Sequence, residues 1–78
     1  MEYTLEIAES EATVSMAGRF TFTDNGTFRN LLDDIYKHTI SSLIINVSGI
    51  DYVDSAALGM FLLLRDHAEK KHILLTLS

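Results

Sequence analysis

Residues in the first quarter of the chain alternate between apolar and polar, as they do in a strand with one buried face. The alternation runs over residues 3–8 and again over 11–17, with a short polar stretch between them. A polar connection this short predicts an antiparallel hairpin. Gly18 then interrupts the pattern, and Phe20 and Phe22 continue it only briefly.

The spacing of apolar residues becomes helical over residues 23–39. Thr23 or Asp24 can cap the start of this predicted helix, whereas Asn25-Gly26 could instead form a turn, which leaves the first residue open. Apolar residues at positions i, i+3, i+4 and i+7 would share one face of the helix: Phe28, Leu31, Leu32 and Ile35.

The next stretch predicts a buried strand followed by a loop. Residues 42–47, SLIINV, are a continuous apolar run rich in β-branched residues, which is typical of a strand covered on both faces. Residues 48–53, SGIDYV, are expected to form a loop.

A second helix is predicted to begin near Asp54 or Ser55 and to end near Lys71, with apolar residues around much of its circumference. Residues 73–77, ILLTL, predict another buried strand. The order is therefore β-β-α-β-α-β within a single domain over residues 1–78, which places the chain in the α/β class. Two successive β-α-β crossovers predict a mixed, mostly parallel sheet with right-handed connections.

Composition and charge narrow the classes of partner. The net charge of −5 argues against nucleic acid and against an anionic membrane. The chain has no cysteine, which excludes disulfides and thiolate metal sites. The first residues lack the basic and apolar regions of a signal peptide, and the apolar run 56–64 is far shorter than a membrane span. We therefore expect a cytoplasmic protein.

Ser55, in the stretch YVDSAALG at 52–59, is the main candidate for a functional residue. It could cap the second helix, act as a nucleophile, or accept a phosphate. The Gly-x-Ser-x-Gly pattern of a hydrolase elbow is absent, because Val53 and Ala57 stand where its glycines would be. An Asp-Ser pair before an apolar helix is typical of a cap. A phosphate at a helix start is also favoured, by free amides and the helix dipole.

No pattern indicates catalysis or a cofactor. The histidines that could serve a serine nucleophile, His67 and His72, come late in or after the second helix, far from its start. They are five positions apart, which does not align them on one helix face for a metal. No glycine-rich phosphate loop occurs. We therefore expect no catalytic residue, no cofactor and no metal.

The segment LIINVSGIDYVDSAALGMFLLL, residues 43–64, resembles the STAS domain, which anti-sigma factor antagonists share with the cytoplasmic tails of sulfate transporters. Residues 48–53 correspond to the loop after the family's apolar strand, and Asp54–Gly59 to the motif with its switch serine. Gly18–Thr21 stands where the family has a short step after its second strand. The predicted order of elements also matches, and the lack of a transmembrane region disfavours the transporter branch.

The resemblance implies a switch. In the antagonist branch, a cognate anti-sigma factor with serine kinase activity phosphorylates the serine, and a PP2C-like phosphatase removes the phosphate. Only the unmodified protein binds the kinase or anti-sigma partner and so frees a sigma factor. By resemblance, Ser55 is the phosphorylated residue and Asp54 its acidic neighbour. The alternative is a STAS scaffold or sensor component of a signalling assembly whose output is not a sigma factor.

The expected partner surface lies where the parallel strands end, because their C-terminal loops share one edge of a sheet. Met60 could join this surface, whereas Phe61, Leu62 and Leu64 are expected in the core. Around Ser55 the surface comprises Thr21, Asp24, Asp51, Tyr52, Val53, Asp54, Ala56 and Leu58.

Departures from the family pattern concern both the motif and the length. Ala56 replaces a frequent second hydroxyl, Ala57 replaces a glycine, and Thr21 replaces an acid. The chain also stops within the strand at 72–78, short of the C-terminal part of the family domain. Either the chain is incomplete, or association covers the exposed edge. We expect a homodimer, which could involve strand exchange, through the outer side of the second helix or through Ile73, Leu75 and Leu77.

Overall fold

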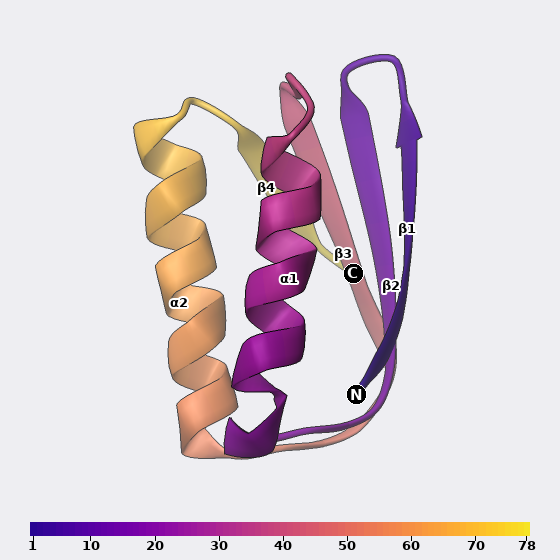
Figure 1. The fold of residues 1–78 in the computed structure, drawn as a ribbon, viewed down its shortest axis with the longest axis vertical. Helices are drawn as coiled ribbons and strands as arrows, with labels where there is room; N and C mark the ends of the chain where they lie inside the picture. The colour runs from indigo at the N-terminus through magenta and orange to yellow at the C-terminus, as the bar shows by residue number, and fades with distance from the viewer.

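The structure is a computed structural model that describes residues 1–78, and it confirms the order of elements expected from the sequence (Figure 1). A hairpin comes first, then a short 3-10 turn leads into the first helix. A strand, the second helix and a last short strand follow. The elements are β1 (Glu2–Ala8), β2 (Glu11–Phe20), η1 (Phe22–Asp24), α1 (Asn25–Tyr36), β3 (Ser42–Val53), α2 (Ser55–Lys70) and β4 (Leu74–Leu77).

The sheet is mixed and mostly parallel, with strand order β1-β2-β3-β4. The first pair, β1 and β2, is antiparallel, whereas β2 with β3 and β3 with β4 are parallel. Both helices lie on the same face of this sheet (Figure 1). The expectation that residues 42–47 are covered on both faces is therefore wrong. Ile44, on the open face, is half-buried between its neighbours Thr13 and Thr76 rather than under a helix.

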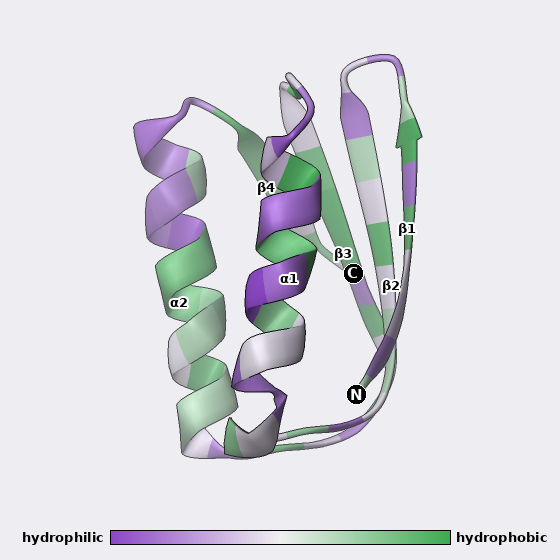
Figure 2. Cartoon of the chain, viewed as in Figure 1, coloured by the Kyte–Doolittle hydropathy of each residue, from purple (hydrophilic) through white to green (hydrophobic).

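The core lies between the sheet and the two helices. Figure 2 shows apolar residues on the turns of α1 that face the sheet and over the first half of α2, whereas the last turns of α2 are hydrophilic. Phe20 from β2 is fully buried, and its ring packs on Phe28 of α1 at 5.4 Å and on Phe61 of α2 at 5.0 Å between centroids. Aromatic contacts in these geometries stabilise a core beyond their buried area.

One residue of α2 contradicts the expected core. The helix meets the sheet through residues spaced for a single face, and Ala57, Leu64 and Ala68 are its buried members. Leu62 lies off that face and is 47% exposed, so its predicted place in the core is wrong. An apolar residue on a helix with apolar positions all around has no periodicity to show which side is buried.

β3 is longer than predicted, because residues 48–53 continue the strand instead of forming a loop. From Ser15 to Phe20, β2 advances five positions, whereas the paired stretch of β3 from Asn46 to Val53 advances seven. The two additional residues form bulges, and the Ser48 amide and hydroxyl both donate to Asn46 Oδ1, at 3.0 and 2.8 Å. Bulges break the alternation that would have indicated a strand.

Gly49 is required at the first of these irregularities. A Cβ atom at this position would lie 2.7 Å from the Met16 backbone oxygen and 3.1 Å from the Ala17 Cβ. We expect Gly49→Ala to lower the free energy of unfolding by about 1–3 kcal/mol, because the backbone must move to relieve the clash. Urea unfolding followed by circular dichroism would measure the change.

Gly59→Ala is the matched control for this prediction. Nothing lies within 4 Å of a Cβ built on Gly59, which sits inside α2, and alanine is the better helix former by about 1 kcal/mol. Equal stability changes in the two variants would contradict the close approach of β3 to β2 at Gly49.

Candidate functional site

The ends of β2 and β3 meet the start of α2 at one edge of the sheet, and Asp54 joins the three. As the N-cap of α2, Asp54 accepts a hydrogen bond from the Ala57 amide through Oδ1, at 2.8 Å. Its Oδ2 accepts one from the Phe22 amide, the first residue of η1, at 3.0 Å. The Asp54 amide donates to the Phe20 carbonyl at 3.3 Å. The Asp54 carboxylate thus links the turn after β2 to the start of α2 through hydrogen bonds to both.

Asp54→Ala is expected to destabilise the chain by about 1–3 kcal/mol, because two amides lose an ionised acceptor. Thermal or urea unfolding would measure the loss. Asp51→Ala is the control: Asp51 is exposed and makes no side-chain hydrogen bond or ion pair within the chain, so we expect a change within about 0.5 kcal/mol. If both variants were equally stable, the hydrogen bonds of Asp54 would have no energetic role.

Ser55 is the first residue of α2 and is exposed. Sequence alone leaves either Asp54 or Ser55 as the cap, and the structure assigns the cap to Asp54. The Ser55 hydroxyl makes no hydrogen bond within the chain and is accessible at a helix N-terminus. Asp54 is therefore the structural member of the pair, and no contact within the chain occupies the Ser55 hydroxyl.

Asp24 is held by two partners and is also largely structural. Its Oδ2 accepts from the Thr21 amide and its Oδ1 from the Met1 ammonium group, both at 2.9 Å. The hydrogen bond from Thr21, followed by that from the ammonium group, lowers the pKa of Asp24 below its ordinary value of 3.8. Thr21 and Asp24, expected at the partner surface, thus lie beside Asp54 through the η1 turn.

The lowered pKa of Asp24 predicts a contribution to acid stability. A carboxylate with a lower pKa in the folded state stabilises that state above the pKa of the unfolded chain, and the contribution disappears as pH falls through the folded value. We therefore expect Asp24→Asn to be less stable than the wild type near neutral pH, with the difference vanishing in strong acid. Urea unfolding midpoints measured across the acidic range would test this; a difference that persists in strong acid would contradict it.

The remaining expected residues form an exposed, largely apolar rim around Ser55. Asp51 and Ala56 are exposed, and Tyr52, Val53 and Leu58 are 46%, 41% and 55% exposed. The structure thus brings the predicted residues of β3 and α2 to one edge, next to η1.

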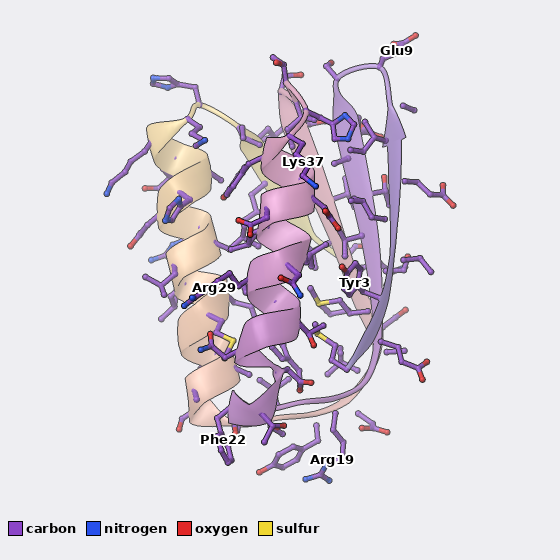
Figure 3. All side chains as sticks on the ribbon, viewed as in Figure 1. Tyr3, Glu9, Arg19, Phe22, Arg29 and Lys37 are labelled. Carbon is purple, nitrogen blue, oxygen red and sulfur yellow. The ribbon has the colours of Figure 1, made fainter.

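Phe22 belongs to the same rim, although sequence reasoning did not single it out. Its side chain is 68% exposed, the second most exposed of the large apolar residues. Figure 3 shows it at the end of the molecule where α2 begins. In the sequence, Phe22 continues the alternation of the preceding strand, a pattern that gives no sign of the turn which exposes it.

The histidine of α2 and the tyrosine on which it stacks lie away from this site. His67, the nearer of the two histidines in and after α2, follows Ser55 by twelve positions, or roughly 18 Å along the helix. Its ring stacks on Tyr36 at 6.1 Å between centroids, and burial raises the pKa of the Tyr36 hydroxyl. No group of three or more histidines and carboxylates is placed to hold a metal ion. Neither helix combines the length and apolarity needed to cross a membrane.

This arrangement is a small mixed sheet, covered by helices on one face, that presents a free serine at a helix start on its edge. A model of the STAS domain family matches residues 2–78 of the chain. The chain therefore belongs to the STAS domain family.

Individual relatives agree with this assignment. A STAS-domain containing protein of Pseudomonas aeruginosa (strain UCBPP-PA14) is 35% identical over 68 residues, which are 87% of this chain and 66% of the relative. The chain thus spans slightly less than two thirds of the length of that curated relative.

Solved structures show the same fold. The Bacillus anti-sigma factor antagonist SpoIIAA in its unphosphorylated form superposes with a TM-score of 0.77 at 17% identity, over 97% of this chain and 71% of that one. An anti-sigma factor antagonist from Mycobacterium paratuberculosis gives a TM-score of 0.80 at 13% identity, over 99% and 67%. At these identities the likeness concerns the fold alone.

Proposed function

We propose that this chain is a non-catalytic binding module that phosphorylation of Ser55 switches off. In the unmodified state it binds an anti-sigma factor with serine kinase activity, and a PP2C-like phosphatase restores that state after phosphorylation. The observation that carries the proposal is the free, exposed hydroxyl of Ser55 beside a helix cap supplied by Asp54. SpoIIAA, which has this fold, is an anti-sigma factor antagonist with a phosphorylated form.

The chemistry of the helix start makes Ser55 a suitable acceptor. A phosphate there carries a charge of about −1.5 to −2 and meets the positive end of the α2 dipole, so the folded chain tolerates it. The rim around it is apolar, through Phe22, Val53 and Leu58. A partner that covers this rim would have to desolvate the phosphate, which costs several kcal/mol when no cation compensates it.

The proposed partner surface surrounds Ser55 on three elements. The η1 turn contributes Thr21 and Asp24, which mainly hold the turn in place, and Phe22 between them. β3 and α2 contribute the exposed residues Asp51, Tyr52, Val53, Ala56 and Leu58, with Asp54 at the junction.

Mapping the phosphate tests the proposal. The purified chain is incubated with ATP and a purified anti-sigma factor that has serine kinase activity, and intact mass and fragment spectra are recorded. We expect one phosphate, on Ser55, and none in Ser55→Ala. Phosphate on another residue would overturn the assignment. Phosphorylation of Ser55 that alters no sigma factor's activity would instead favour a scaffold or sensor role.

The proposal also includes self-association. The edge strand β4 and the outer side of α2 leave several leucines exposed, and a second copy of the chain would cover them in a homodimer.

A further inference from the structure

Arg19 differs from the other exposed basic residues because its guanidinium lies over an aromatic ring of the proposed partner surface. Its Cζ atom lies 4.3 Å from the centroid of the Tyr52 ring, within the range of a cation–π interaction. The two residues are cross-strand partners of β2 and β3, and both are exposed. Stacking on a ring orients a guanidinium group and leaves the N–H donors in its plane available to another molecule.

The backbone beside Arg19 is shaped by a bulge. Gly18 has a φ of +87°, in the left-handed region that favours glycine. The pairing with β3 shifts between Gly18 and Arg19, where Asp51 is the additional residue of β3. Bulges re-aim side chains and are frequent beside functional sites. Figure 3 shows Arg19 at the end of the molecule where α2 begins, as it does Phe22.

The guanidinium of Arg19 has no anionic partner within the chain. The two ion pairs of the structure join other residues, and no side-chain hydrogen bond involves Arg19. Both carboxylates that organise this edge are engaged elsewhere: Asp24 accepts from Thr21 and Met1, and Asp54 accepts from two backbone amides. The donors of Arg19 are therefore free on the surface proposed to bind the partner.

We propose that Arg19, oriented by Tyr52, recognises an oxyanion of the bound partner, namely a carboxylate side chain on its surface. The inference rests on the proposed function. A planar guanidinium can hold a carboxylate through two parallel hydrogen bonds, and arginine and tyrosine are enriched among residues that dominate binding energy. A carboxylate near this edge would also repel a phosphate on Ser55. The same partner group would then favour the unmodified chain and disfavour the phosphorylated one.

The test compares variants in calorimetric titrations against the purified serine kinase that modifies Ser55. Arg19→Gln should raise the Kd about tenfold or more, and Arg19→Lys should recover only part of the affinity because it lacks the planar fork. Arg29→Gln, which removes an exposed arginine from α1, is the matched control and should bind as the wild type does. Titrations at two salt concentrations should show weaker salt dependence for Arg19→Gln than for Arg29→Gln.

Each outcome has a distinct meaning. Titrations with nucleotide-free and with ADP-loaded kinase locate the oxyanion. If Arg19→Gln loses affinity for both forms of the kinase, the oxyanion is a carboxylate of the kinase. If it loses affinity only for the ADP-loaded form, the carboxylate is overturned in favour of a nucleotide phosphate. If Arg19→Gln and Arg29→Gln bind both forms of the kinase equally well, recognition of an oxyanion by Arg19 is overturned. The binding of Ser55→Asp still tests the phosphorylation switch in that case. Full binding by Ser55→Asp, with weakened Arg19→Gln, overturns the switch and leaves the recognition of an oxyanion standing. Absence of wild-type binding overturns both.

Discussion

Ser55→Asp is expected to weaken binding of the serine kinase partner at least a hundredfold, whereas Ser55→Ala should still bind. A hundredfold loss corresponds to about 2.7 kcal/mol, which is within the cost of desolvating a carboxylate at an apolar interface. The rim supplies that interface, since Phe22 and Leu58 flank the helix start with most of their side chains exposed. Calorimetric titration of the purified chain and its variants against the kinase would measure both affinities.

The control for this prediction is Thr39→Asp. Thr39 is exposed in the connection between α1 and β3, which lies at the opposite end of the molecule from the start of α2 (Figure 1). The substitution Thr39→Asp adds the same charge to a chain of net charge −5 without touching the rim. We expect Thr39→Asp to bind normally. Equal binding by Ser55→Ala and Ser55→Asp, or equal loss in Ser55→Asp and Thr39→Asp, would remove the case for a local switch.

The elements of the fold could be predicted from the sequence where periodicity was unbroken. The alternation at 3–8 and the helical spacing from Phe28 to Ile35 specify which face is buried, and the structure confirms both faces. Residues 48–53 could not be recognised as strand. A bulge is a property of the pair of strands, so the sequence of β3 alone does not show that the partner β2 has fewer residues over the same distance.

The residues of the candidate site were predictable as a group but not in their roles. The motif around Ser55 and the rule for parallel strands together locate the edge. Asp54 and Asp24, however, are occupied by amides of the η1 turn, and those contacts depend on the tertiary fold. Arg19, which we propose to contact the partner, could not be singled out from the sequence, because only cross-strand pairing brings it to Tyr52.

The second large effect concerns the two edges of the sheet, which differ in how they are protected. β1, at one edge, carries the exposed residues Glu2 and Glu6, and charges of this kind discourage pairing with another chain. β4, at the other edge, has the sequence LLTL and no charge. The amides of Leu74 and Ser78 donate toward β3, so those of the alternate residues between them point to the open side.

Exposed apolar side chains lie on and beside the open edge of β4. Leu74 and Leu77 of β4 are 69% and 56% exposed, and Leu58 and Leu62 of α2 are 55% and 47% exposed. An apolar hollow between α2 and β4 contains one charged residue, Arg65, and no carboxylate in its lining: Leu58, Phe61, Leu62, Leu64, Arg65, Leu75 and Leu77. A second copy fits such a surface, because a two-fold axis would pair neutral β4 with neutral β4 and bring the leucines together without opposing carboxylates.

We therefore expect the 78-residue chain to sediment as a dimer at about tens of micromolar, and Leu77→Lys to sediment as a monomer. A two-fold interface contains both substituted lysines, so one substitution buries two charges and removes two apolar contacts. Leu63→Lys is the matched control, because Leu63 is 60% exposed but lines the groove between α1 and α2, away from β4. Sedimentation velocity with binding of a hydrophobic dye distinguishes the outcomes. A wild-type monomer without dye binding would show that the β4 edge needs no cover, and a monomeric Leu63→Lys would move the interface to the groove between the helices.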